Sequence, residues 1–154
     1  MRKFINIVLE NQEIRSVNDL DDYEGDSLKP DCTKKIPEEI QFADFSFVFW
    51  MGGDIEEMKS KYECFIEALD KATDEVIDHK DMVTGQICVN PEKVEYLMNN
   101  PTDNLPIIYR WNMNNIIQDG NHRITADVLN GKTNTKCQVL HLDEYFDEKG
   151  NLID

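Results

Sequence analysis

The residues best suited to chemistry lie in one short stretch, IIQDGNHRITADVLNGK, residues 116–132. At its centre are an acid, a glycine, an amide, an imidazole and a guanidinium: Asp119, Gly120, Asn121, His122 and Arg123. Gly120 lets the backbone approach a ligand closely and adopt a positive φ. Arg123 can bind a phosphate through two parallel hydrogen bonds, and His122 can donate to a phosphate oxygen or transfer a proton. Asp119 can orient these cations or hold Mg²⁺.

The neighbouring elements predict how this stretch folds. Residues 107–111 (IIYRW) and 116–118 (IIQ) are expected to form a hairpin around the turn NMNN, and residues 121–130 a helix that ends before Gly131. The first amides of such a helix have no intrahelical acceptor, and with the helix dipole they favour an anion. We therefore predict a phosphate or nucleotide site at Gly120, Asn121, His122 and Arg123. In the alternative interpretation, Asp-Gly is an ordinary turn, and His122 and Arg123 are solvated.

The rest of the chain predicts an α/β (α+β) fold, with a small mixed sheet and flanking helices. Helical spacing of apolar residues and an Asp54 N-cap predict a helix over 54–72. Residues 82–89 predict a strand, residues 91–99 a helix begun by Asn90 and Pro91, and CQVLHL, residues 137–142, a strand. Further strands are expected near 4–17 and 42–51.

We expect residues 1–154 to form a single domain in three parts. Residues 1–75 are an N-terminal extension with strands and the long helix, residues 76–144 are the core, and residues 145–154 are an acidic tail.

The charge balance is strongly acidic, with 31 acidic against 16 basic residues and a net charge of −15. Such a field repels duplex nucleic acid and favours solubility. Five of the nine residues in NDLDDYEGD, residues 18–26, are acidic. This segment is interpreted as a solvated loop, a metal-binding loop or a mimic of a phosphate backbone. Its acids are Asp19, Asp21, Asp22, Glu24 and Asp26.

The four cysteines are widely spaced, which argues against a zinc site. No apolar stretch approaches ~18 residues, and the N-terminus lacks the features of a signal peptide. We expect a cytoplasmic protein with free thiols and no membrane contact.

The segment PIIYRWNMNNIIQDGNHRITADVLNGKTNTKCQVLHLDE resembles the signature end of the ParB/sulfiredoxin superfamily. The preceding VTGQICVNPEKVEYLMNNP resembles a second common element of that superfamily, a strand followed by a short helix. The likeness covers roughly residues 76–144, and the motif is that of the DGxHR subgroup. It implies that Gly120, Asn121, His122 and Arg123 form a phosphate-binding turn. Asn121 stands where sulfiredoxins carry their reactive cysteine, which argues against sulfinic-acid reduction.

The resemblance implies a nucleotide-dependent phosphotransferase or NTP hydrolase that uses ATP or CTP with Mg²⁺. His122 and Asp119 are the expected catalytic residues, and Asp119 the expected metal ligand. The general base is unassigned, with His79 and Asp81 as candidates. The alternative is an acidic, non-catalytic module that binds a basic protein partner, for instance as a nucleic-acid mimic. A ParB-like nuclease is disfavoured by the net charge of −15. The oligomeric state is left open.

Overall fold

The computed structural model describes residues 15–16, 35–42, 55–86 and 88–153. The fold is α/β, as the sequence predicts. The described helices are α2 (Ile55–Lys61), α3 (Cys64–Asp70), α4 (Pro91–Asn99) and α5 (Asn121–Leu129), with 3₁₀ turns η3 (His79–Asp81) and η4 (Leu142–Glu144). The strands are β1 (Arg15–Ser16), β2 (Gln41–Phe42), β3 (Thr73–Asp78), β4 (Met82–Thr84), β5 (Ile107–Trp111), β6 (Asn114–Asp119) and β7 (Asn134–His141).

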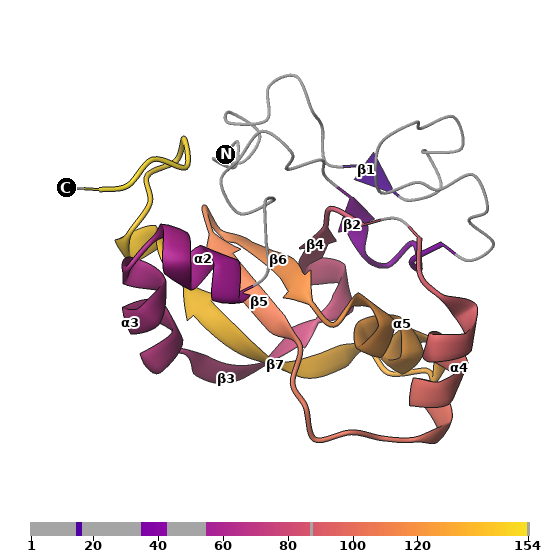
Figure 1. Cartoon of the computed structure of the whole chain (residues 1–154). Coiled ribbons are helices and arrows are strands. Elements are labelled where there is room, and N and C mark those ends of the chain that lie inside the picture. The colour runs from indigo at the N-terminus through magenta and orange to yellow at the C-terminus, as the bar shows by residue number, and fades with distance from the viewer. Residues whose placement is uncertain (1–14, 17–34, 43–54, 87, 154) are drawn as a thin grey trace.

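The described strands form one mixed sheet (Figure 1), in the order β1-β2-β4-β6-β5-β7-β3. β6 runs parallel to β4 and antiparallel to β5, and β7 runs parallel to β5 and antiparallel to β3. The two-residue strands β1 and β2 extend the sheet beyond β4. β3 therefore forms the opposite edge of the described sheet.

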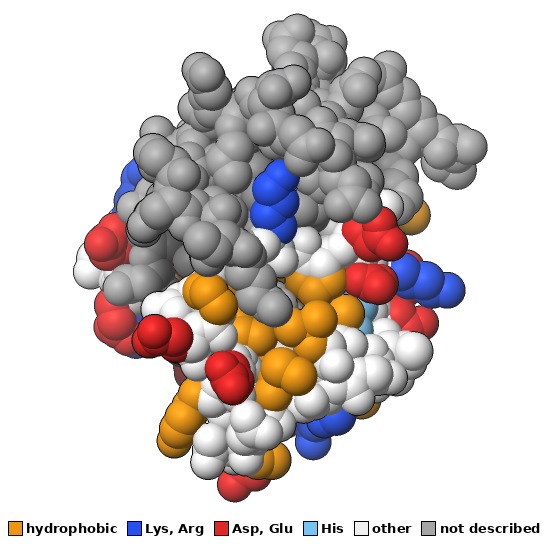
Figure 2. Space-filling model, turned by 90° about the vertical axis from the view of Figure 1, so that its right-hand side faces the viewer, with side chains coloured by type: hydrophobic (Ala, Val, Ile, Leu, Met, Phe, Trp, Pro, Cys, Tyr) orange, Lys and Arg blue, Asp and Glu red, His pale blue; other side chains and the backbone are white. Residues whose placement is uncertain are grey.

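Each face of the sheet carries its own hydrophobic cluster. Helices α2 and α3 contribute Met58 and Phe65 to one cluster, which includes Tyr109 of β5 and Leu140 of β7. Helices α4 and α5 pack on the other face, where Val94, Ile124 and Ala126 meet residues such as Ile108, Ile117 and Val139. Successive residues of β5, Ile108 and Tyr109, thus point into different clusters, as a strand covered on both faces requires. Figure 2 shows the side that carries α4, where hydrophobic side chains gather among acidic ones.

The predicted hairpin is confirmed. Trp111 pairs with Asn114, so the loop contains only Asn112 and Met113. Both of these residues have positive φ, 48° and 65°, as a type I′ turn requires. The predicted helix over 91–99 is also confirmed, with the Asn90 side chain accepting hydrogen bonds from the Glu92 and Lys93 amides.

The predicted helix over 54–72 is wrong in its continuity. It is divided into α2 and α3, because the amides of Phe65 and Ile66 bond three residues back, to the carbonyls of Tyr62 and Glu63. Residues 73–78, which directly follow the predicted helix, form the strand β3. β-Branched residues and six paired positions along β7 favour the sheet there.

The predicted strand over 82–89 is shorter than expected. β4 ends at Thr84, whose hydroxyl accepts from the Gln86 amide and so turns the chain out of the sheet. The last predicted strand is longer than expected, because β7 begins at Asn134. Most of the strands expected over 4–17 and 42–51, and the whole 18–26 acidic segment, lie outside the described residues.

The acidic tail is anchored by aromatic residues. Phe146 is buried in the α2–α3 cluster, and the Trp111 indole donates to the Asp147 carbonyl. No helix in the described ranges is long and apolar enough to cross a membrane. Cys64 and Cys137 are free, but Cys88 is disulfide-bonded, so the prediction of free thiols is wrong for Cys88.

Adjacent residues of α3 test the α2–α3 cluster. Phe65 is fully buried against Tyr109, whereas Ile66 is 50% exposed. We expect Phe65→Ala to lower the free energy of unfolding by ~3–5 kcal/mol and Ile66→Ala by less than ~1 kcal/mol. Chemical denaturation measures both. Equal losses would contradict the assignment of α3's buried face.

Candidate functional site

The turn between β6 and α5 has the predicted strand–turn–helix geometry. β6 ends at Asp119, and α5 begins at Asn121. Gly120 lies between them with φ 103°, in the left-handed region that favours glycine. A Cβ at this position would lie 2.6 Å from Cβ of Pro106, so space as well as backbone conformation requires glycine here.

Asn121 faces the protein interior, with only 8% of its surface exposed. Its Oδ1 accepts a hydrogen bond from the Thr84 hydroxyl at 2.8 Å, and its Nδ2 lies 3.5 Å from Oε1 of Gln86. The first residue of α5 therefore fixes the point at which the chain leaves β4.

The imidazole of His122 contacts the beginning of α4. Its Nε2 accepts a hydrogen bond of 3.0 Å from the backbone amide of Asn90, the α4 N-cap. Because Nε2 is the acceptor, the proton of the neutral ring is on Nδ1. Burial and the nearby Lys93 lower the pKa of His122, while Asp119 opposes this shift. A neutral His122 therefore offers Nδ1–H as a donor, and its half-buried imidazole is bonded to the protein through Nε2 rather than fully solvated.

Arg123 holds the segment that follows α4. Its Nη1 donates to the carbonyls of Thr102 at 2.8 Å and Asn104 at 3.1 Å. Its Nε lies 3.5 Å from Oδ1 of Asp127, one turn further along α5. The interpretation of Arg123 as a solvated first-turn residue is therefore wrong, since its side chain is only 20% exposed and bound on two sides.

These four residues act on the two ends of one excursion of the chain. Asn121 and His122 contact the chain before α4, while Gly120 and Arg123 contact the chain after it. We call residues 120–123 the α4 clamp and residues 85–106 the α4 excursion. The clamp explains why an amide, an imidazole and a guanidinium follow one another in this turn, without reference to any ligand.

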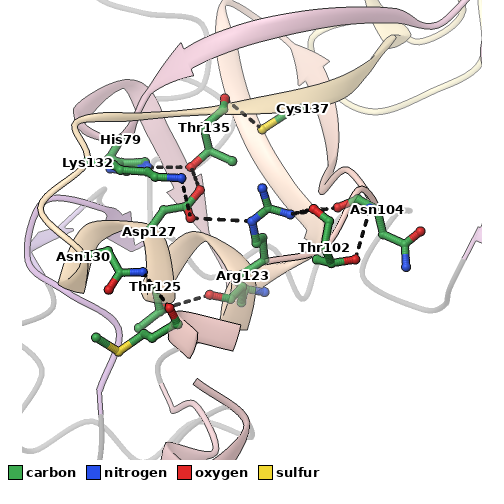
Figure 3. Close-up of polar contacts among 12 residues, drawn as sticks. His79, Thr102, Asn104, Arg123, Thr125, Asp127, Asn130, Lys132, Thr135 and Cys137 are labelled. Atoms are coloured by element: carbon green, nitrogen blue, oxygen red, sulfur yellow. Dashed lines mark hydrogen bonds and ion pairs between the residues drawn. The ribbon is translucent and has the colours of Figure 1, made fainter. Parts of the chain in front are cut away.

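A buried chain of polar contacts runs from His79 through Thr135 to Asp127, which lies near Arg123 of the clamp (Figure 3). The Thr135 hydroxyl donates to Oδ2 of Asp127 at 2.6 Å, and it also lies 2.8 Å from Nε2 of His79. Thr135 has one hydroxyl proton, so His79 must donate from Nε2. Burial lowers the pKa of His79. His79 therefore lies beside the middle of α5 as a buried donor, which argues against its expected role as the general base.

Three charged or titratable groups remain at the amino end of α5. Asp119 is exposed at the end of β6, and the electrostatic influence of both Asp119 and Lys93 reaches His122. Gly120 is the N-cap of α5 and has no side chain to cap the first helical amides. Lys93 and Asp119 are thus both near enough to His122 to influence its charge, beside the uncapped first turn of α5.

The metal prediction depends on Asp119 alone. Within the described parts of the chain, no three His, Cys, Asp or Glu side chains are grouped so that they could hold a metal ion. A cation at Asp119 would therefore need phosphate oxygens and water as further ligands, which is the usual arrangement for Mg²⁺ bound with a nucleotide.

Sequence reasoning missed the partners of the clamp, namely Thr84, Gln86, Asn90, Thr102, Asn104 and Asp127. Only Asn90 carried a signal, as a helix N-cap. Thr102 and Asn104 act through their carbonyls, which no side-chain pattern reveals. Comparison of the chain with protein-family models, with curated proteins and with solved structures gave no match. The superfamily resemblance therefore stays a prediction.

Substitutions at two glycines distinguish the cost of a left-handed backbone from the cost of a steric clash. Gly120 and Gly131 both have positive φ, but a Cβ at Gly131 would have no neighbour within 4 Å. Gly131→Ala should cost ~1–2 kcal/mol of unfolding free energy, from the left-handed backbone alone. Gly120→Ala should cost a further ~1–3 kcal/mol, because Pro106 must move. Denaturation curves that coincide for the two variants would contradict the close approach of Pro106.

The buried His79 and the half-buried His122 predict acid sensitivity. Both have a lowered pKa in the folded state, so as pH falls the unfolded chain takes up protons first, near its ordinary value of about 6.5. Stability present at pH 7.5 should decrease towards pH 5.5, a range above the titration of ordinary carboxylates. Denaturation at each pH measures this, and His122→Gln should reduce the slope. A stability that rises as pH falls would contradict the lowered pKa values of the two histidines.

Proposed function

We propose that the chain binds the phosphate groups of a nucleoside triphosphate at the amino end of α5. The observation that carries the proposal is the set of donors there. The first amides of α5 have no intrahelical acceptor and no side-chain cap. His122 belongs to this first turn, and Lys93 is near enough to influence its pKa. An anion at this point would be stabilised by the helix dipole and by one mobile cation.

The clamp changes which side chains support this proposal. Arg123 and Asn121 are engaged within the protein, so they position the amides and need not contact the ligand. His122 keeps its Nδ1 proton available for a phosphate oxygen, while Nε2 stays bonded to the Asn90 amide. Lys93, exposed in the first turn of α4, supplies the positive charge.

The carboxylate of Asp119 is the reason that the proposal includes a divalent metal ion. A carboxylate beside a triphosphate repels it, unless a divalent cation bridges the two. The proposal therefore includes Mg²⁺ held between Asp119 and the phosphates. The superfamily resemblance adds phosphoryl transfer or hydrolysis as the expected activity, with Asp119 and His122 at the reacting phosphate. These reactions depend mainly on positioning and on compensation of charge. The proposal assigns the compensation of charge to Lys93, His122 and the metal ion.

Two lysines test the binding proposal. Lys93→Ala should weaken binding of ATP or CTP roughly tenfold to a hundredfold, because it removes a charge-assisted contact worth ~1.5–3 kcal/mol. Lys80→Ala is the matched control, since Lys80 is exposed in η3, outside the turn. Isothermal titration with and without Mg²⁺ measures the affinities. Equal weakening by both variants would indicate only the loss of overall charge.

The Asp119→Asn variant provides the metal test in the same titrations. Without Mg²⁺ it should bind nucleotide more tightly than the wild type, because a repulsive charge is lost. With Mg²⁺ the wild type should gain affinity and the variant should not. Absence of nucleotide binding by the wild type under both conditions would contradict the proposal and favour the acidic module that binds a basic protein.

A further inference from the structure

The open edge of the sheet has the properties of a peptide-binding strand. β3 is the last strand in the sheet order and pairs only with β7 among the described strands (Figure 1). At six residues it has the typical length of a strand inside a sheet, whereas exposed edges are commonly short. Val76, at its centre, is 63% exposed.

The register shows which backbone groups face outwards. The His79 amide donates to the Thr133 carbonyl at 2.9 Å, and this pair continues the β3–β7 register. Hydrogen-bonded and non-hydrogen-bonded pairs alternate along an antiparallel ladder. Ile77, Glu75 and Thr73 therefore bond to β7. The N–H and C=O groups of Asp74, Val76 and Asp78 then point to the open edge.

The side chains of these outward residues define the partner. Asp74, Val76 and Asp78 are all exposed, so the edge presents acid, apolar residue and acid at every second position. We propose that β3 binds an extended basic segment of another protein by strand addition, with lysine or arginine opposite Asp74 and Asp78 and an apolar residue opposite Val76. The net charge of −15 favours approach of such a partner.

A second copy of this chain fits the edge poorly. Antiparallel pairing of two β3 strands about Val76 would place Asp74 of each copy opposite Asp78 of the other. Like charges directly opposite each other destabilise a strand pair. The two aspartates therefore disfavour self-association and favour a basic partner at the same backbone groups. This inference does not depend on the nucleotide proposal, because the α5 turn contributes nothing to the edge.

The test uses the whole chain and the peptide Lys-Thr-Val-Thr-Lys, acetylated and amidated. In ¹⁵N NMR titrations, we expect shifts centred on the amides of residues 73–78. The same peptide with an N-methyl group on its central valine should bind at least about tenfold more weakly, because it loses a backbone donor. Equal binding of the methylated peptide, absence of binding by the unmethylated one, or shifts centred elsewhere would overturn the proposal.

Charge variants provide the matched control. Asp74→Asn with Asp78→Asn should weaken peptide binding. Asp70→Asn with Asp103→Asn removes the same two charges from exposed positions outside β3 and should leave binding nearly unchanged. Asp74→Lys places opposite charges across the self-paired edge, so this variant should dimerise in analytical ultracentrifugation more strongly than Asp74→Asn. If the two double variants weakened peptide binding equally, binding would depend only on the overall charge of the protein, and the proposal would be overturned.

Discussion

The hydrogen bonds of Arg123 to the carbonyls of Thr102 and Asn104 fix to α5 the segment that joins α4 to β5. The chain leaves the sheet after β4 and returns to it at β5, and α4 lies between these two strands. Asn121 and His122 hold its entry, and Arg123 holds its exit. Because these residues are consecutive on α5, any shift of α5 along the sheet would disturb both ends of the α4 excursion together.

The same constraint organises the interior below α5. Asp127 accepts from Thr135 and lies near the cations of Arg123 and Lys132. A buried carboxylate is costly unless it is paired and hydrogen-bonded, so the loss of any one partner affects the others. The polar chain therefore links β7, α5 and the α4 excursion. An anion bound to the first amides of α5 would act on this linked unit rather than on an isolated turn.

Local sequence signals were sufficient to predict the β5–β6 hairpin and the helices α4 and α5. The hairpin, α4 and α5 each have their own turn or cap residues, and their positions follow from those residues. The division of α2 from α3 and the strand β3 could not be predicted in this way, because they depend on Phe65 packing on Tyr109 and on pairing with β7. The site shows the same limit. The types of residues 119–123 predict a ligand turn, but the carbonyls that bind Arg123 become adjacent only through the tertiary fold.

The central claim, that Arg123 fastens the α4 excursion, is tested most directly by hydrogen–deuterium exchange of Arg123→Ala. Lys132→Ala is the control, since Lys132 also lies near Asp127 but makes none of the described contacts to the 102–104 carbonyls. We expect Arg123→Ala to lose protection across residues 91–106 while β5, β6 and β7 keep theirs, and Lys132→Ala to resemble the wild type. Unchanged protection of residues 91–106 in Arg123→Ala would contradict the account.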